Sequence, residues 1–425
     1  MRTRRLSLTS NQFDWLAVSL YFLLVLLGWL NIYAAVYDDE LGASIFDFSI
    51  NSGRQLIWIS TSVLIILVIS IIDFRFYDSF AFIVLGVIVV MLVSVLIFGS
   101  EVKGSKSWFG IGAFGIQPSE FAKFATALAL AKFLSQPTIK FEKISTQLMS
   151  LGIIAVPAAL ILLQGDTGTA MVFACFIIVL YREGLSPVFF MIGFAFVLLF
   201  ILTLLVNKLV LIIGLLTLGL LAAALSGRNI KKIGVVIVST VFMFGFVQSV
   251  DFIMNKVLKP HQQKRVMQLI DPNADPLGAG WQVTQSKIAI GSGGLFGKGY
   301  LQGTQTKFDF VPDQSTDNIF CTVGEEHGWF GGLILIAAFL ALLLRITQLA
   351  ERQKSKFARV YGYGVASILF FHFAFNIAMT IGLFPVIGIP LPFFSYGGSS
   401  LWAFTILLFI FLKLDAHRMQ IFTRS

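Results

Sequence analysis

The sequence is short of charge. Only 12% of its 425 residues are Asp, Glu, Lys or Arg, while 57% are hydrophobic and the mean hydropathy is +0.87. Soluble proteins carry about 25% charged residues, so this composition excludes an ordinary soluble domain. Apolar runs close to the length of a membrane-spanning helix recur from end to end. They lack the alternation of membrane strands, and the sequence therefore predicts an all-α polytopic membrane protein.

Cysteine and histidine are also scarce. The two cysteines, Cys175 and Cys321, are too few for a disulfide framework, and their apolar surroundings favour small buried side chains. The four histidines are scattered without the spacing of metal ligands, so we expect no histidine-built metal site. The net charge of +9 is no nucleic-acid signal, because most of it lies in short loops between the apolar runs.

The apolar runs predict twelve membrane helices. The first, after Phe13, is longer than the apolar part of a signal peptide and lacks a small-residue cleavage site, so we expect it to stay in the protein. The expected helices cover about 13–35, 56–72, 80–98, 118–134, 148–163, 168–182, 187–206, 209–225, 233–250, 317–344, 361–383 and 400–412. Basic residues in the short loops of one side predict that both termini are cytoplasmic. One membrane domain, 1–425, accounts for the whole chain.

Polar residues collect in the loops that this topology places outside, whereas an enzyme with a cytoplasmic substrate would crowd them inside. Glu120 and Lys123 are three residues apart at the start of a helix and share a face. They form either a structural ion pair or the polar wall of a cavity. Asp166 lies directly before the expected helix 168–182. It caps that helix, faces the same cavity, or does both.

The long segment 251–316 is basic, although the positive-inside rule does not require this of an outer segment. Its basic residues form either a solvated surface or a site for an anionic group such as a lipid phosphate or pyrophosphate. Residues 285–290 (QSKIAI) predict a short amphipathic helix, and the glycines of 291–299 would let the backbone approach a ligand closely. The basic residues are Lys256, Lys259, Lys264, Arg265, Lys287, Lys298 and Lys307.

Asp317 stands where the next long apolar run begins. A charge at the mouth of a membrane helix is costly, which makes it a functional candidate. The alternative is that Asp317 or Thr316 merely caps the helix. Glu325 and Glu326 lie a little over two turns further along, and we expect one of them to pair or hydrogen-bond within the bundle.

Seven stretches together resemble one known family, the SEDS proteins (shape, elongation, division and sporulation). They are QPSEFAK at 117–123, GDTGTA at 165–170, HQQKR at 261–265, QSKIAIGSGG at 285–294, FVPDQSTD at 310–317, GEEHG at 324–328 and GIPLPFFSYGGSS at 388–400. The resemblance covers nearly the whole chain. The tripeptide GTQ at 303–305 is similar to the elongation members of the family rather than to its division members.

The resemblance implies a peptidoglycan glycosyltransferase. Such enzymes polymerise lipid II at the outer face of the bacterial cytoplasmic (inner) membrane during cell elongation, with a class B penicillin-binding protein that crosslinks the product. The family's essential aspartate falls on Asp317, which would take the proton of the acceptor hydroxyl. Basic residues would stabilise the departing polyprenyl pyrophosphate, and a divalent cation (Mg²⁺ or Mn²⁺) could share this task. The substrate-binding candidates are Lys123, Glu120, Asp166, Gln285, Lys287, Lys298 and Lys106.

The chain departs from the family in four places. Ser107 replaces a usual Arg, so that a phosphate contact would fall to Lys106. Gly165 replaces a usual Pro, and Ser315 replaces a His that could exchange a proton with the essential carboxylate. The chain is also longer than the family by roughly two helix lengths, which predicts a ten-helix core with an inserted helical hairpin within 187–250.

Two other functions fit the same topology. A lipid II flippase would need charges near the bilayer midplane and polar access from both sides, whereas the polar residues here cluster on one side. A non-catalytic scaffold of the elongation machinery would not need the carboxylate of Asp317. The glycosyltransferase is therefore the preferred interpretation.

Overall fold

The computed structural model describes residues 13–37, 42, 44–102, 104–111, 114–227, 229–252, 254, 256, 263, 267, 279–308 and 310–418. The chain divides into two compact units. The first contains Met1–Leu185 and Gln282–Ser425, and the second contains Ser186–Trp281. Each unit is helical and is described by itself.

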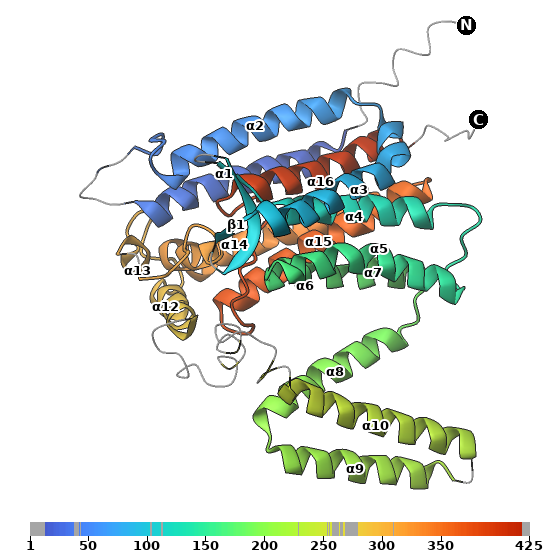
Figure 1. Ribbon diagram of the computed structural model, residues 1–425. Coiled ribbons are helices and arrows are strands. Elements are labelled where there is room, and N and C mark those ends of the chain that lie inside the picture. Colours follow the sequence, from blue (N-terminus) through green and yellow to red (C-terminus); the bar gives the residue numbers. More distant parts are fainter. Residues whose placement is uncertain are drawn as a thin grey trace, which may run out of the picture. The chain divides into compact units, whose positions relative to one another are not determined.

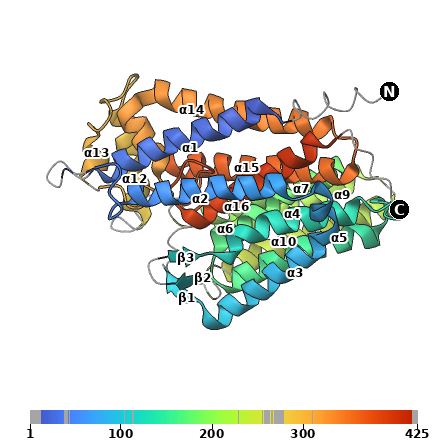
Figure 2. The ribbon, with the colours of Figure 1, turned by 90° about the horizontal axis from the view of Figure 1, so that it is seen from above.

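The first unit is a bundle in which α4, α15 and α16 form the interior (Figures 1 and 2). Against this interior, α3 and α5 pack on α4, α2 packs on α16, and α14 packs on α15 and α1. The helices are α1 (Trp15–Val36), α2 (Asn51–Ile71), α3 (Phe74–Phe98), α4 (Pro118–Leu134), α5 (Ile144–Leu163), α6 (Thr167–Val172), η1 (Phe173–Cys175), α7 (Phe176–Arg182), α12 (Ala279–Ser292, which begins just before this unit), α13 (Thr304–Lys307), α14 (Ile319–Glu351), α15 (Lys356–Thr380) and α16 (Gly398–Ala416).

Small side chains explain why α4 lies in the interior. The helix begins at Pro118. Proline has no backbone N–H, but an N–H in the first turn of a helix has no partner within the helix, so none is lost. Small residues let neighbouring helix backbones approach closely in a membrane, where no hydrophobic effect drives helices together. The alanines of α4 that are buried against its neighbours are Ala122, Ala125, Ala127, Ala129 and Ala131.

Helices stand at all twelve expected places. Among the described residues, ten helices are long and apolar enough to cross a membrane: α1, α2, α3, α5, α8, α9, α10, α14, α15 and α16. The other two expected spans are α4, with 17 residues, and the broken helix α6–η1–α7. The all-α membrane fold is thus confirmed, and the count of twelve spans stays a prediction.

Among its described residues, the second unit contains α8 (Val188–Leu205), α9 (Lys208–Leu225) and α10 (Ile230–Phe252), which pack on one another. Its side chains are apolar and mostly exposed, and α9 buries none of its residues. Such helices suit a lipid environment, where apolar surface needs no cover. The unit falls where the inserted hairpin is expected. The hairpin itself and the single membrane domain stay predictions.

The loop expected at 99–117 contains a small sheet that the sequence did not predict. Strands β1 (Ser100–Val102), β2 (Ser105–Ile111) and β3 (Phe114–Ile116) are antiparallel in the order β1-β2-β3. β2 packs against the end of α3, as Figure 2 shows. The predicted helix 285–290 is confirmed within α12, which is longer at both ends.

Ion pairs join helix ends at one end of the first unit. Arg345 of α14 donates through Nε to both carboxylate oxygens of Asp14, the N-cap of α1, at 3.1 Å. Arg352 at the end of α14 donates through Nε to Asp415 of α16 at 3.0 Å. Burial by itself raises the pKa of Asp14, but the hydrogen bonds from Arg345 and Ala17 N–H and the charges of both arginines together hold it below its usual value. Asp317 precedes the opposite end of α14.

Candidate functional site

Asp317 lies in the turn 311–318, directly before α14, and its side chain is half-buried. Asn318 occupies the N-cap position of that helix and makes no side-chain capping bond. The N-cap position is thus taken by Asn318, and neither Asp317 nor Thr316 occupies it. The functional interpretation of Asp317 stays as a prediction.

Loop 381–397, which joins α15 to α16, packs against this turn. A Cβ atom built on Gly388 would lie 3.4 Å from Asp317 Oδ2, so the carboxylate faces this glycine. Gly388 has φ = +74°, a conformation that costs other residues energy and glycine very little. Tyr396 N donates to Ser315 O at 2.9 Å and ties the loop to the turn.

α15 holds the same turn from within the bundle. Asn376, which is completely buried, donates through Nδ2 to Asp317 O and to Ile389 O, both at 2.7 Å. An amide nitrogen carries two hydrogens, so both bonds form at once. The backbone of Asp317 is thereby joined to α15 and to the loop.

Glu120 and Lys123 form the ion pair that their spacing predicts, with Lys123 Nζ 2.8 Å from Glu120 Oε2. Lys123 Nζ also lies 3.0 Å from His372 Nε2 and 4.5 Å from the centre of the Phe404 ring. The two charged side chains are only 2% and 4% exposed, so they lie inside the bundle. A substrate would reach Lys123 only if this packing opened.

Asp166 is the N-cap of α6, and its carboxylate accepts a hydrogen bond from Thr169 N at 3.0 Å. The capping role is thus confirmed. The same carboxylate accepts from Gln117 Nε2 at 3.0 Å, and Gln117 N donates to Ser399 Oγ at 3.2 Å. These bonds join the starts of α4, α6 and α16, next to the loop that faces Asp317.

Lys287 is the basic candidate on α12. Its side chain is exposed, and a Cβ atom built on Gly382, just beyond α15, would lie 2.5 Å from Lys287 Nζ. The ammonium group is therefore held beside the start of loop 381–397. Gln285, on the same helix, is buried. An exposed ammonium at this position is available to an anionic ligand.

Lys298 is engaged within the protein. Its Nζ lies 2.7 Å from Glu325 Oε1 and 2.7 Å from Thr304 Oγ1. The buried Glu325 carboxylate also accepts from the N–H groups of Gln305 and Thr306 at 2.8 and 2.9 Å. The pairing expected of Glu325 is confirmed. Lys298 would have to leave this carboxylate before it could bind a phosphate.

The glycines that follow α12 pack against α14. A Cβ atom on Gly293 would clash with Gly324 O, and one on Gly297 would clash with Glu326 O. In the structure the partner of this segment is the first turns of α14, and its close approach to a ligand stays a prediction. The segment thus holds in place the helix that begins beside Asp317.

Lys106, on β2, donates to Ile97 O at the end of α3 at 2.9 Å. A cation there stabilises the unpaired carbonyl groups of a helix C-terminus. Its neighbour Ser107 is buried and lies 3.1 Å from Ser105 Oγ through its own hydroxyl. Three further basic residues of the outer segment, Lys259, Lys264 and Arg265, lie outside the described residues.

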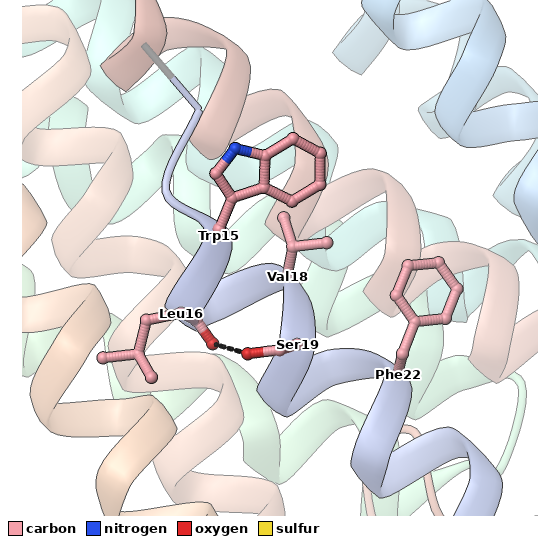
Figure 3. A pocket seen from close by; sticks show the side chains of 5 residues that line it. All are labelled: Trp15, Leu16, Val18, Ser19 and Phe22. Carbon is pink, nitrogen blue, oxygen red and sulfur yellow. Dashed lines mark hydrogen bonds between the residues drawn. The ribbon is translucent and has the colours of Figure 1, made fainter. Parts of the chain in front are cut away.

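An apolar pocket of about 740 Å³ on α1 is the subject of Figure 3, and it lies beside Asp14, far along α14 from Asp317. Its lining is Trp15, Leu16, Val18, Ser19 and Phe22. Ser19 Oγ donates to Leu16 O at 3.0 Å, so the one polar side chain of the lining is satisfied locally. The pocket offers apolar surface to lipid and no reactive group.

Comparison with known proteins gives one family. The chain matches the sequence model of the cell cycle proteins FtsW, RodA and SpoVE over residues 14–212 and 181–420. It is 34% identical to the peptidoglycan glycosyltransferase RodA of Treponema pallidum, over 96% of this chain and 99% of that protein. It is also 34% identical to the peptidoglycan glycosyltransferase MrdB of Escherichia coli K12, over 87% of this chain and 86% of that protein.

Solved structures agree in fold. The chain is similar to one from a peptidoglycan synthase complex that coordinates polymerization and crosslinking, with a TM-score of 0.69 and 25% identity over 97% of this chain and 100% of that one. It is also similar to the rod shape determining protein RodA of Thermus thermophilus, with a TM-score of 0.63 and 23% identity over 97% of this chain and 99% of that one.

Proposed function

The chain belongs to the FtsW, RodA and SpoVE family, and from this membership we propose that it is a peptidoglycan glycosyltransferase that polymerises lipid II into glycan strands during cell elongation. Relatives that it matches over most of their length carry that activity in their names. The observation that supports the proposal at the level of residues is the position of Asp317. Its half-buried carboxylate faces Gly388 in a setting fixed by α15 and loop 381–397.

In this proposal Asp317 is the general base. It removes the proton of the acceptor hydroxyl as that oxygen attacks the anomeric carbon of the donor sugar. The bond between that carbon and the pyrophosphate oxygen breaks, and the polyprenyl pyrophosphate leaves with the electron pair. The exposed ammonium of Lys287, beside the loop that faces Asp317, is the first candidate to stabilise this charge.

The other candidates act from less direct positions. Asp166 caps α6, and Gln285 is buried on the helix that carries Lys287. Lys106 would bind phosphate only by leaving Ile97 O. Glu120 and Lys123 support the site from inside the bundle. Among the described residues no three His, Cys, Asp or Glu side chains could hold a metal ion together, so we derive no step through a metal.

The proposal includes an orientation and a partner. Asp317 and loop 381–397 lie at the end of the first unit opposite Asp14 and Arg352, and we place them at the outer face of the cytoplasmic membrane, with both termini inside. This leaves the basic residues of α14's far end on the cytoplasmic side, as the positive-inside rule requires. A class B penicillin-binding protein would crosslink the product, in keeping with the polymerization and crosslinking of the similar complex.

The test is polymerisation of lipid II by the protein purified with its penicillin-binding partner. We expect Asp317→Asn and Asp317→Ala to lower the rate by about 10²–10⁴-fold, because a positioned base contributes that much. Glu101→Gln, which changes an exposed carboxylate on β1, is the matched control and should polymerise normally. Polymer from both Asp317 variants at the wild-type rate would refute the assignment, whereas movement of lipid II across vesicles without polymer would favour a flippase.

A further inference from the structure

Two buried polar side chains on α15, His372 and Asn376, are spaced four residues apart. This spacing is about one helical turn, so they lie one above the other on the same face. Both are almost completely inaccessible, with 1% and 0% exposure. A buried polar group is costly unless its hydrogen bonds are made, which makes their partners informative.

The partners are consecutive carbonyl groups of loop 381–397. His372 Nδ1 lies 3.1 Å from Pro390 O, and Asn376 Nδ2 lies 2.7 Å from Ile389 O. Two neighbouring carbonyl groups held by two side chains one turn apart fix the register of the loop on α15. A shift of the loop by one residue would break both bonds.

The contact of His372 also fixes its protonation. A carbonyl oxygen only accepts, so the proton of the imidazole is on Nδ1. Nε2 then has a lone pair, and it lies 3.0 Å from Lys123 Nζ, a group that only donates. One neutral tautomer satisfies both contacts, and it connects the loop to the buried Glu120–Lys123 pair.

Asn376 extends the connection to Asp317. Its second amide hydrogen is directed at Asp317 O, also at 2.7 Å. The same side chain thus holds the backbone of Asp317 and the carbonyl next to Gly388, the residue that the Asp317 carboxylate faces. The relative position of the carboxylate and the loop depends on this one amide.

We propose that His372 and Asn376 are positioning residues for glycosyl transfer. Together they hold loop 381–397 and the turn of Asp317 in the arrangement in which the carboxylate reaches the acceptor hydroxyl. This inference rests on the proposed function. A reacting group displaced by about 1 Å can lose about 10²-fold in rate, so the loss of either side chain acts on kcat and leaves the binding of lipid II largely unchanged.

The first comparison sets Asn376→Leu against Thr405→Val. Leucine keeps the size of Asn376 but makes neither hydrogen bond. Thr405, on α16, is also completely buried. Its hydroxyl lies 2.9 Å from Tyr21 OH and donates to Leu401 O of its own helix at 2.6 Å, so it bonds no carbonyl group of the loop. Both variants should lower Tm, because each leaves buried polar partners unsatisfied. We expect kcat to fall about 10²-fold for Asn376→Leu, with an almost unchanged KM, and to stay near the wild-type value for Thr405→Val.

The second comparison uses two of the described histidines, His372 and His417, each of which contacts a backbone carbonyl. His372→Phe removes the contact with Pro390 O, whereas His372→Asn places an amide donor near the position of Nδ1 and should recover part of kcat. His417→Phe is the control, because His417 Nδ1 lies 2.9 Å from Lys413 O at the far end of α16. It should leave kcat unchanged.

The outcomes separate the two proposals. If the wild type makes no polymer with lipid II, the proposed function fails and the positioning role fails with it. If the wild type polymerises and Asn376→Leu retains its kcat, the positioning role alone is refuted. The positioning role is also refuted if kcat falls in proportion to Tm in both Asn376→Leu and Thr405→Val. It is refuted as well if the kcat of His372→Asn is no higher than that of His372→Phe.

Discussion

The buried Glu120–Lys123 ion pair allows a stability experiment with a large expected effect. Lys123→Met removes the ammonium group and leaves the Glu120 carboxylate only 4% exposed. Loss of one partner of a buried ion pair costs about 3–5 kcal/mol, because the remaining charge stays buried without compensation. His372 Nε2 loses its donor in the same variant, which places the expected loss of unfolding free energy at the upper end of that range.

Removal of both charges should restore much of this loss. In the double variant Glu120→Gln/Lys123→Met no charge remains buried, and replacement of a whole buried pair is often neutral. The exposed pair of Arg182 and Glu351 is the control, since its side chains are 49% and 50% exposed. Arg182→Met should cost no more than about 1 kcal/mol.

The measurement is thermal unfolding of the purified protein in detergent. A loss of 1 kcal/mol lowers Tm by about 2–4 °C in domains of 150–250 residues. On this scale the loss of about 3–5 kcal/mol in Lys123→Met should lower Tm by at least about 6 °C. The double variant should melt closer to the wild type than Lys123→Met does. Equal shifts for Lys123→Met and Arg182→Met, or a double variant as unstable as the sum of its two single changes, would refute the reasoning.

Two further predictions concern packing and pH. In α6, a Cβ atom on Gly168 would clash with Ile387 O, so Gly168→Ala should cost about 1–3 kcal/mol of stability and lower the rate of polymerisation. Gly152→Ala is the control, because a Cβ atom there meets nothing within 4 Å, and it should change neither quantity. Equal Tm values for the two variants would contradict the contact. Burial raises the pKa of Asp14, but its bonds to Arg345 and the nearby charges hold it below 3.8. The stability that the ionised Asp14 gives the fold is therefore fully present above about pH 4, and it is lost as the pH falls through the lowered pKa of Asp14. Asp14→Asn should lower Tm at pH 7 and converge with the wild type in acid, and a constant difference would contradict this.

The positions of the helices could be predicted because membrane helices carry their signal locally, in runs of apolar residues. Their ends were predicted less well. α2 begins at Asn51 rather than near 56, and α14 continues to Glu351 rather than 344. Polar turns at a membrane surface continue a helix without adding to its hydropathy, so hydropathy underestimates helix length. The sheet within 99–117 depends on pairing between strands of three to seven residues, for which the sequence has no comparable signal.

The candidate site was predicted in part for the same reason. The pairing of Glu120 with Lys123 and the cap formed by Asp166 depend on neighbours within four residues, and both are confirmed. The partner of Lys298, Glu325, is 27 residues away, and the sequence indicated a ligand as the partner instead. His372 and Asn376 were missed, although two polar residues at positions i and i+4 of an apolar helix are a signal of a buried polar contact.

The contacts of the Gly- and Lys-rich segment 291–299 indicate a structural role. The segment packs on residues 324–326 and pairs with Glu325, so it holds the first turns of α14. Gly328 has φ = +66° and ψ = −164°, which interrupts α14 just beyond those turns. Asp317 therefore lies in the turn that leads into a short helical block, residues 319–327, which this segment contacts, while Asn376 of α15 holds the turn itself. Because the kink separates that block from the membrane-facing remainder of α14, the geometry around the proposed base depends on loop contacts at the bundle's end more than on the packing of the long helix that follows it.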